Sequence, residues 1–335
     1  MTTLHRIRAA RRLRQSRRRR VLAGLALLIA ALVALSLMLG QSLTPPMGVL
    51  RVLAGQDVPG ASFTVGKLRL PRAVMALLAG AAFGMGGVSF QIMLRNALAS
   101  PDIIGISTGA SAAAVVAIVL LGLSGPVVSV LAVAAGLAVA LAIYGLSWRG
   151  GVAGTRLILI GIGVAAMLNS VIAYTLSRAP AWDLQQALRW LSGSVNGAQL
   201  SQALPLAVTL ALAGGLLMSR ARDLEALRMG EDMAAALGVR VGLTRTIVII
   251  CATGMIAVAT AVTGPIAFVA FLSGPIAARI VGAGRSLLLP SALVGAALVL
   301  IGDYCGQFLL PGRYPVGVVT GALGAPYLIY LIIRV

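Results

Sequence analysis

Side chains that could perform chemistry are scarce in this chain of 335 residues. It has one histidine, His5, and two cysteines, Cys251 and Cys305, which lie far apart in the sequence. A transition-metal site draws its ligands from clusters of such residues, so we predict no metal site and no catalytic residue. Asp303 is the only acid inside a long apolar segment, and we expect it to be a structural partner of an arginine or a backbone group.

Nucleotide chemistry finds no support in the sequence either. The only lysine, Lys67, stands in Gly66-Lys67-Leu68, which lacks the upstream glycine and the Ser or Thr of a phosphate-binding loop. We therefore expect no cofactor to be bound directly by this chain. If the protein moves a solute against a gradient, we expect ATP and Mg²⁺ to be bound by a partner ATPase.

The composition is that of a membrane protein. Hydrophobic residues make up 59% of the chain, charged residues only 10%, and the mean hydropathy is +1.01, which excludes a soluble enzyme. Apolar runs of about 20 residues recur, each long enough to cross the ~30 Å hydrocarbon core as a helix. We predict an all-α polytopic membrane protein with about ten transmembrane helices, at 21–40, 71–94, 103–123, 125–147, 153–177, 201–219, 244–263, 265–282, 287–310 and 315–334.

The basic residues are distributed unevenly, and this distribution predicts the topology. The formal net charge is +19, and nine of the 27 basic residues are arginines within the first 20 positions. Cytoplasmic flanks of membrane helices collect arginine and lysine, so no nucleic-acid partner is expected. With the N-terminus inside, inner segments hold 20 of the 27 basic residues, which predicts that both termini are cytoplasmic. The chain divides into a basic cytoplasmic tail, 1–20, and a transmembrane domain, 21–335.

The start of the chain allows one alternative interpretation. Ser16-Arg17-Arg18 before an apolar run has some likeness to a twin-arginine export signal. The run from Val21 to Leu39 has 19 residues, however. Signal peptides usually have an apolar region of about 7–15 residues, so a retained first helix is favoured.

Three connections are long enough to have a function. Segments 41–70 and 178–200 are predicted outside, and prolines in 41–70 should prevent a long helix there. Segment 220–243 is predicted inside and holds half of the eight acids. It predicts two short helices, the second opened by Glu231 and Asp232 and ended by Gly238.

The second of these short helices has an apolar face. Met233 and Leu237 lie four residues apart, a spacing that suits insertion into a cleft of a partner protein. The alternative is a helix lying on the lipid headgroups, which the acids disfavour beside an anionic leaflet. Within the long apolar segments, glycines four residues apart predict close helix packing: Gly80 and Gly84, Gly105 and Gly109, Gly317 and Gly321.

Several stretches, taken in order, resemble one family, the FecCD-type permease subunits of binding-protein-dependent ABC importers for iron–siderophores, haem and vitamin B12. The resemblance covers residues 21 to 335. It is carried by the following motifs: Arg69-Leu70-Pro71-Arg72, then Gln91 and 95–105 (RNALASPDIIG), Ala236-Leu237-Gly238, 264–269 (GPIAFV), 315–320 (PVGVVT) and Gly324-Ala325-Pro326.

The resemblance implies a ten-helix permease of the type II ABC importer fold, acting as one of two in a dimer. It implies two copies of an ABC ATPase inside, which hold ATP–Mg, and a periplasmic or lipid-anchored substrate-binding protein outside. Arg69 and Arg72 match the arginines with which the family docks the binding protein. The fifth helix is implied along the translocation path, with Asn169, Ser170 and Tyr174 as its most polar residues. The inner loop matches the ATPase-coupling helices, with Arg228, Gly230, Glu231, Asp232, Met233, Leu237 and Gly238 as coupling residues.

The sequence also departs from the family pattern. Ala97 stands where a proline is common, Gly274-Pro275 where Pro-His is usual, and Arg313 near a position where an acid or glutamine is common. These changes suggest one member of an unlike pair, so the second permease subunit is expected to be a non-identical homologue.

The substrate expectation is a ferric siderophore crossing the bacterial inner membrane. Residues 160–164 (IGIGV) and Asp303-Tyr304-Cys305 look most like permeases for catecholate siderophores. The alternatives are a cobalamin or haem importer and, from another class, a stand-alone secondary carrier.

Overall fold

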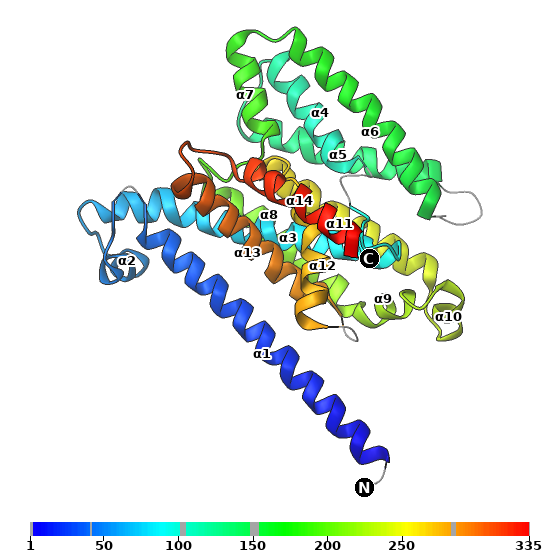
Figure 1. Cartoon of the computed structure of the whole chain (residues 1–335). Helices are drawn as coiled ribbons and strands as arrows, with labels where there is room; N and C mark the ends of the chain where they lie inside the picture. The colour runs from blue at the N-terminus through cyan, green and yellow to red at the C-terminus, as the bar shows by residue number, and fades with distance from the viewer. Residues whose placement is uncertain (1–2, 41, 101–104, 148–153, 283–285, 335) are drawn as a thin grey trace.

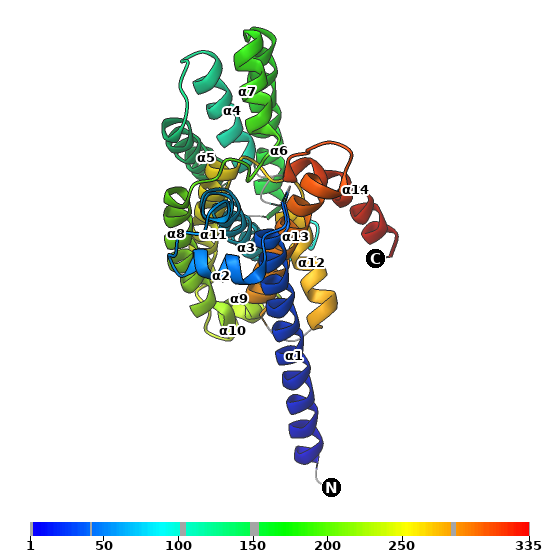
Figure 2. The same cartoon turned by 90° about the vertical axis from the view of Figure 1, so that its left-hand side faces the viewer.

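The computed structural model describes residues 3–40, 42–100, 105–147, 154–282 and 286–334, among which helices occur and no strand does. Residues 101–104 of the RNALASPDIIG motif therefore lie outside the described residues, as do Arg149 and Arg285, which were counted for the topology. Helix α1 (Thr3–Met38) projects well beyond the rest of the molecule toward the N-terminus (Figures 1 and 2).

Each of the ten predicted spans contains a described helix, which confirms the fold class. Seven described helices are long and apolar enough to cross a membrane, and α4, α12 and α14 are shorter apolar helices. The ten are α1, α3 (Leu70–Met93), α4 (Ile106–Val119), α5 (Pro126–Ser147), α6 (Gly154–Ser177), α8 (Leu200–Ser219), α11 (Val241–Thr263), α12 (Val269–Val281), α13 (Leu288–Tyr304) and α14 (Val316–Arg334).

The connections contain helices of their own. Helix α2 (Pro46–Leu53) and a π-helical segment, η1 (Ser62–Arg69), lie between α1 and α3, and α7 (Ala181–Leu191) lies between α6 and α8. The inner loop forms α9 (Ala221–Leu227) and α10 (Glu231–Ala236), and η3 (Cys305–Leu309) extends α13. Figure 1 shows α2 at one end of the molecule and α10 at the other; these are called the α2 end and the α10 end.

The second span begins earlier than predicted. Segment η1 runs directly into α3, giving one apolar stretch from Ser62 to Met93, where the sequence analysis expected it to start at 71. Pro71 lies in the first turn of α3, where the missing N–H leaves no helical hydrogen bond unmade. Pro71 therefore lies at the start of α3 without interrupting the continuity with η1.

Helix α3 is the centre of the bundle and packs on α13, α11, α12 and α8. Its glycines allow the close approach that the spacing of Gly80 and Gly84 predicted. A Cβ added at Gly80 would overlap the carbonyl oxygen of Gly295, and one at Gly84 the carbonyl oxygen of Ser291, both on α13. Gly87 lies in the same way against the backbone of Ala270 on α12. Helices α4 to α7 form a group beside this core (Figures 1 and 2), and α4 and α5 join the core through α11.

The C-terminal part of α3 also supplies a hydrogen bond that α12 cannot make by itself. Pro275 lacks an N–H, so the carbonyl of Phe271 one turn earlier has no helical donor. Gln91 Nε2 donates a hydrogen bond to that carbonyl at 2.9 Å. Gly274 leaves the room that the Gln91 amide needs, since a Cβ at 274 would overlap Gln91 Oε1. The Gly274-Pro275 pair and Gln91 thus form one packing unit.

The glycine contacts predict a stability difference between two otherwise similar substitutions. Gly84→Ala should lower stability by about 1–3 kcal/mol, because α3 and α13 must move apart to admit the methyl group. Gly254→Ala in α11 is the matched control, because no atom lies within 4 Å of the added Cβ. We expect a lower melting temperature in detergent for the first variant and an equal or higher one for the second. Equal melting temperatures would contradict the close approach.

Candidate functional site

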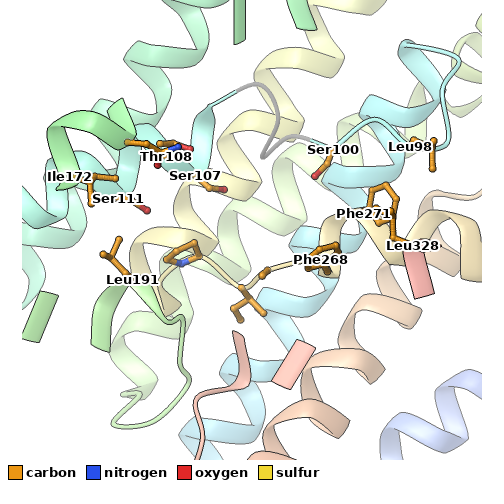
Figure 3. Close-up of a pocket in the computed structure, with 14 residues that line it drawn as sticks. Leu98, Ser100, Ser107, Thr108, Ser111, Ile172, Leu191, Phe268, Phe271 and Leu328 are labelled. Carbon is orange, nitrogen blue, oxygen red and sulfur yellow. The ribbon is translucent and has the colours of Figure 1, made fainter. Parts of the chain in front are cut away.

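A cavity of about 600 Å³ lies between α4, α6, the segment 265–268, the start of α12 and the C-terminal part of α14. Figure 3 shows side chains from these separate elements turned toward it. Its polar groups are hydroxyls and one carboxamide, and its largest apolar groups are two phenylalanines. The lining includes Ser107, Thr108, Ser111, Asn169, Phe268 and Phe271.

The wall of the cavity contains non-helical backbone. Residues Gly264 to Phe268 separate α11 from α12, and Phe268 has a left-handed backbone with φ of 63°. Backbone of this kind is tolerated at membrane depth where it is enclosed by protein or lines a cavity. The Phe268 ring lies against Gly324 of α14 and meets the Phe271 ring edge-on, with centroids 6.3 Å apart. The aromatic wall is therefore built from three elements.

The described lining residues of the cavity carry no ionisable side chain. Ser107 and Ser111 are 6% and 3% exposed, so the hydroxyls belong to a well-packed α4. A surface of apolar groups, hydroxyls and one amide can contact a large ligand at many points without holding it through a strong ion pair. Such a lining suits the passage of a ligand better than its tight retention.

Of the residues predicted on the translocation path, only Asn169 lines the cavity. Ser170 and Tyr174 lie on exposed faces of α6. The Ser170 hydroxyl donates to the carbonyl of Ala166 at 3.1 Å, and the Tyr174 ring lies 5.1 Å from the Arg178 guanidinium. Their place on the path remains a prediction.

Arg69, predicted as a docking residue, holds the end of helix α1. Its Nη1 donates to the carbonyls of Leu37 and Met38 at 2.9 and 3.0 Å, and its Nη2 donates to the Ser42 carbonyl at 2.7 Å. The last carbonyls of a helix lack intrahelical donors and carry partial negative charge, so a guanidinium there is stabilising. Gly40 makes room for it, since a Cβ at 40 would overlap the guanidinium group.

Arg72, the second predicted docking residue, forms an ion pair with Asp303. Arg72 Nε and Nη2 donate to the two carboxylate oxygens of Asp303, each at 2.6 Å, and Nη1 reaches Asn196 Oδ1 at 3.3 Å. The side chains are only 19% and 13% exposed. The expected arginine partner of Asp303 is thereby confirmed. The sequence analysis did not predict that the arginine partner of Asp303 would be Arg72, which is itself a docking candidate. An isolated acid in an apolar segment does indicate that a cation lies nearby.

At the α10 end, the two predicted short helices are present. Helix α10 begins with Glu231 and Asp232, and Gly238 follows it with a φ of 82°. Glu231 forms an ion pair with Arg245 of α11. The apolar face of α10 is open, with Met233 53% and Leu237 60% exposed.

The turn between α9 and α10 completes this surface. Arg228 contacts Glu225 at 3.4 Å, and Gly230 has a φ of 113°, a conformation that favours glycine. Ala234, which follows Met233 in the helix, is fully buried, so α10 is anchored on the rest of the chain. The surface is therefore an exposed apolar patch beside charged groups, which suits contact with a partner protein. Its use for docking stays a prediction.

Comparisons with known proteins agree with this architecture. The family model described as the FecCD transport family matches residues 27–334. The chain is 40% identical to the Ferric enterobactin transport system permease protein FepG of Escherichia coli (strain K12), over 85% of this chain and 87% of that one. It is 34% identical to the Ferric enterobactin transport system permease protein FepD of the same strain, over 93% and 94%.

A solved structure is also similar over almost the whole chain. It is described as an inward-facing conformation of a metal-chelate type ABC transporter, and it matches with a TM-score of 0.82 and 26% sequence identity. The match covers 95% of this chain and all of that one. The helix order and packing described above are thus shared with that transporter.

The Arg72–Asp303 pair predicts a measurable coupling energy. Asp303→Asn leaves a half-buried guanidinium without its carboxylate and should cost about 1–3 kcal/mol, less than a fully buried pair would. Arg228–Glu225 is the matched control, because it is more exposed and should contribute about 0–1 kcal/mol. The check is the melting temperature in detergent of Asp303→Asn, Arg72→Gln and the double variant, beside Glu225→Gln. A loss no greater than that of Glu225→Gln would count against a structural role for the pair.

Proposed function

Because the chain belongs to the FecCD transport family, we propose that it is the permease subunit of a binding-protein-dependent ABC importer for a ferric catecholate siderophore. The observation that carries this is the family match over residues 27–334, together with 40% identity to a ferric enterobactin permease. The chain is a multi-pass membrane protein of the metal-chelate importer type. It acts as a non-catalytic subunit that forms the path for the solute.

The cavity supports a path for a large aromatic chelate. Its volume of about 600 Å³ is in the range of pockets that enclose drug-sized ligands. Phe268 and Phe271 offer aromatic faces and edges to catechol rings, while Asn169 and the α4 hydroxyls can meet their oxygens. A binding protein would supply the affinity, and weak contacts in the permease would permit release.

A second, non-identical permease subunit completes the proposed path. The chain is similar to both FepG and FepD, two permease proteins named for the same transport system. Helix α6 supports this by its exposure. Its apolar side chains Leu159 and Met167 are 64% and 71% exposed, on the helix that also carries the cavity residue Asn169. Such a face suits contact with another helix bundle.

The α10 end is proposed to dock the ATPase, and two copies of it would serve the two permeases. Arg228, Gly230, Glu231, Asp232, Met233, Leu237 and Gly238 are the proposed coupling residues. Arg18 of α1 donates to the carbonyl of Ser286 at 2.9 Å, which holds the basic part of α1 beside the α12–α13 connection. With the positive-inside rule, this arrangement supports a cytoplasmic α10 end in the bacterial inner membrane, both termini included.

Two alternative functions are compatible with parts of these observations. A cobalamin or haem importer would use the same architecture, and the apolar cavity would suit either ligand. A stand-alone secondary carrier is disfavoured because such carriers use ionisable groups near the midplane, whereas Asp303 is already paired with Arg72.

Uptake in cells tests the substrate. Iron-starved cells with and without the gene would be given iron-55 as ferric enterobactin, iron-55 as ferrichrome, and labelled cobalamin. We expect loss of ferric enterobactin uptake in the deletion strain and its return with the gene. Loss of cobalamin uptake alone would overturn the substrate and keep the importer. Uptake abolished by an uncoupler, and unaffected by ATP depletion, would favour a secondary carrier.

The coupling surface is tested by removing its apolar contacts. Met233→Ser with Leu237→Ser should abolish stimulation of ATP hydrolysis by the loaded binding protein, because the exposed side chains would no longer fill the ATPase cleft. Leu13→Ser in the basic part of α1 is the control, since Leu13 is also 70% exposed. Stimulated hydrolysis at the wild-type level in the double variant would contradict the coupling assignment.

A further inference from the structure

The basic end of α1 has no part in the proposed path, although it holds nine of the 27 basic residues. The chain has no acid before Asp57, so no carboxylate within this segment balances the arginines. We propose that Arg17, Arg19 and Arg20, here called the proximal cations, form a binding site for the phosphate groups of anionic phospholipids in the inner leaflet. This inference does not depend on which solute the permease carries.

Arg18 fixes the orientation of the basic end of α1. Its Nη2 donates to the carbonyl of Ser286 at 2.9 Å, so Arg18 faces the connection between α12 and α13. Successive residues of an α-helix are turned by about 100° about its axis. The proximal cations therefore lie on the other sides of the helix, and all three are exposed. None of them forms a hydrogen bond or an ion pair with the described residues.

The apolar part of α1 is suited to face lipid. Only 17% of its most apolar window is buried within the chain, and Leu27 is 72% exposed. Helix α1 packs mainly on α13. Figures 1 and 2 show it on the side of the core away from α6, whose exposed face is proposed to meet the second permease. A subunit bound at α6 would leave α1 in contact with lipid, and the proximal cations in contact with lipid headgroups.

The position of the apolar run places the proximal cations at the depth of the phosphates. The run begins at Val21, directly after Arg20. At a rise of 1.5 Å per residue, Arg17 lies only ~6 Å from Val21 along the axis of α1. The anionic surface of the inner leaflet attracts basic residues within about one Debye length, which is ~8 Å at physiological salt. Arg11 lies ~15 Å from Val21, outside this range.

The chemistry of the proximal cations matches a phosphate group. A guanidinium group can donate two parallel hydrogen bonds to phosphate oxygens. Arg17 and Arg20 lie three residues apart, a spacing at which like charges destabilise a helix. A bound anion removes this repulsion. A phospholipid supplies the anion together with acyl chains that can lie along the exposed apolar side chains of α1, such as Leu27.

The test compares two lipids that differ only in the headgroup. The full-length chain in dodecyl maltoside would be titrated with dioleoyl phosphatidylglycerol or dioleoyl phosphatidylcholine, and bound lipid would be counted by native mass spectrometry. The wild-type chain should bind phosphatidylglycerol with a Kd at least about tenfold lower. Arg17→Gln with Arg19→Gln and Arg20→Gln, the proximal variant, should reduce this preference to about twofold or less. Six of the nine tail arginines remain in it, which keeps the orientation of α1.

The matched control removes the same charge from the far part of the tail. Arg6→Gln with Arg8→Gln and Arg11→Gln, the distal variant, changes positions beyond the reach of the headgroups. Its preference for phosphatidylglycerol should stay within about twofold of the wild-type preference. Both variants should keep the wild-type melting temperature in phosphatidylcholine micelles, because Arg18 and its contact with Ser286 are untouched.

Lysine substitution separates the effect of charge from an effect on folding. Arg17→Lys with Arg19→Lys and Arg20→Lys, the lysine variant, keeps three cations that can bind phosphate and should keep most of the preference. Raising NaCl to about 1 M, where the Debye length is ~3 Å, should abolish the preference of the wild-type chain.

Three results would overturn the lipid site. The first is a wild-type preference in the proximal variant; if the distal variant then failed to co-purify with the ATPase, the ATPase would be the partner of the tail. The second is an equal loss in the proximal and distal variants, which would assign the effect to overall charge. The third is a lysine variant that binds like the proximal variant, which would assign the loss to altered packing of α1. No readout uses a siderophore, so failure of the proposed function would be seen separately in the uptake experiment.

Discussion

The structure depends on the close contact of α3 with α12 and α13. In lipid, apolar side chains gain little by leaving one apolar environment for another, so helix association relies on tight packing and hydrogen bonds. Helix α3 uses both. Gly80, Gly84 and Gly87 bring its backbone onto the neighbouring helices along its length, while Arg72 and Gln91 tie its two ends to α13 and α12. The other helices are arranged around this three-helix core.

The rigid core explains where the path can lie. Helices α4 to α7 form a second group, and the cavity lies where that group meets the loop before α12 and the C-terminal part of α14. Helix α12 is short, Phe268 in the left-handed region precedes it, and Phe271 of its first turn lines the cavity. Because α4 and α5 join the core through α11, a path at this boundary could change width while α3 keeps its contacts with α12 and α13. Such a change would leave the glycine-packed interface of α3 intact.

Sequence reasoning succeeded where the signal was local. The ten spans, the two helices of the inner loop and the contacts of Gly80 and Gly84 follow from hydropathy, caps and spacing over a few residues. Sequence reasoning failed where the partner of a residue lay far away in the sequence. Arg72 meets Asp303 across 231 positions, and no local pattern reveals which arginine lies beside that acid. The start of the second span was also misplaced, because a proline in a first helical turn resembles a helix boundary.

The Arg72–Asp303 pair also bears on the docking role of Arg72, which stays a prediction. If a partner carboxylate took Arg72, it would have to displace Asp303, which is only 13% exposed and would then keep its charge without a cation. The exchange would form one ion pair and break the Arg72–Asp303 pair, which is largely shielded from solvent. Arg69 and Arg72 can therefore contribute to docking by fixing the shape of the α2 end, through the end of α1 and through Asp303.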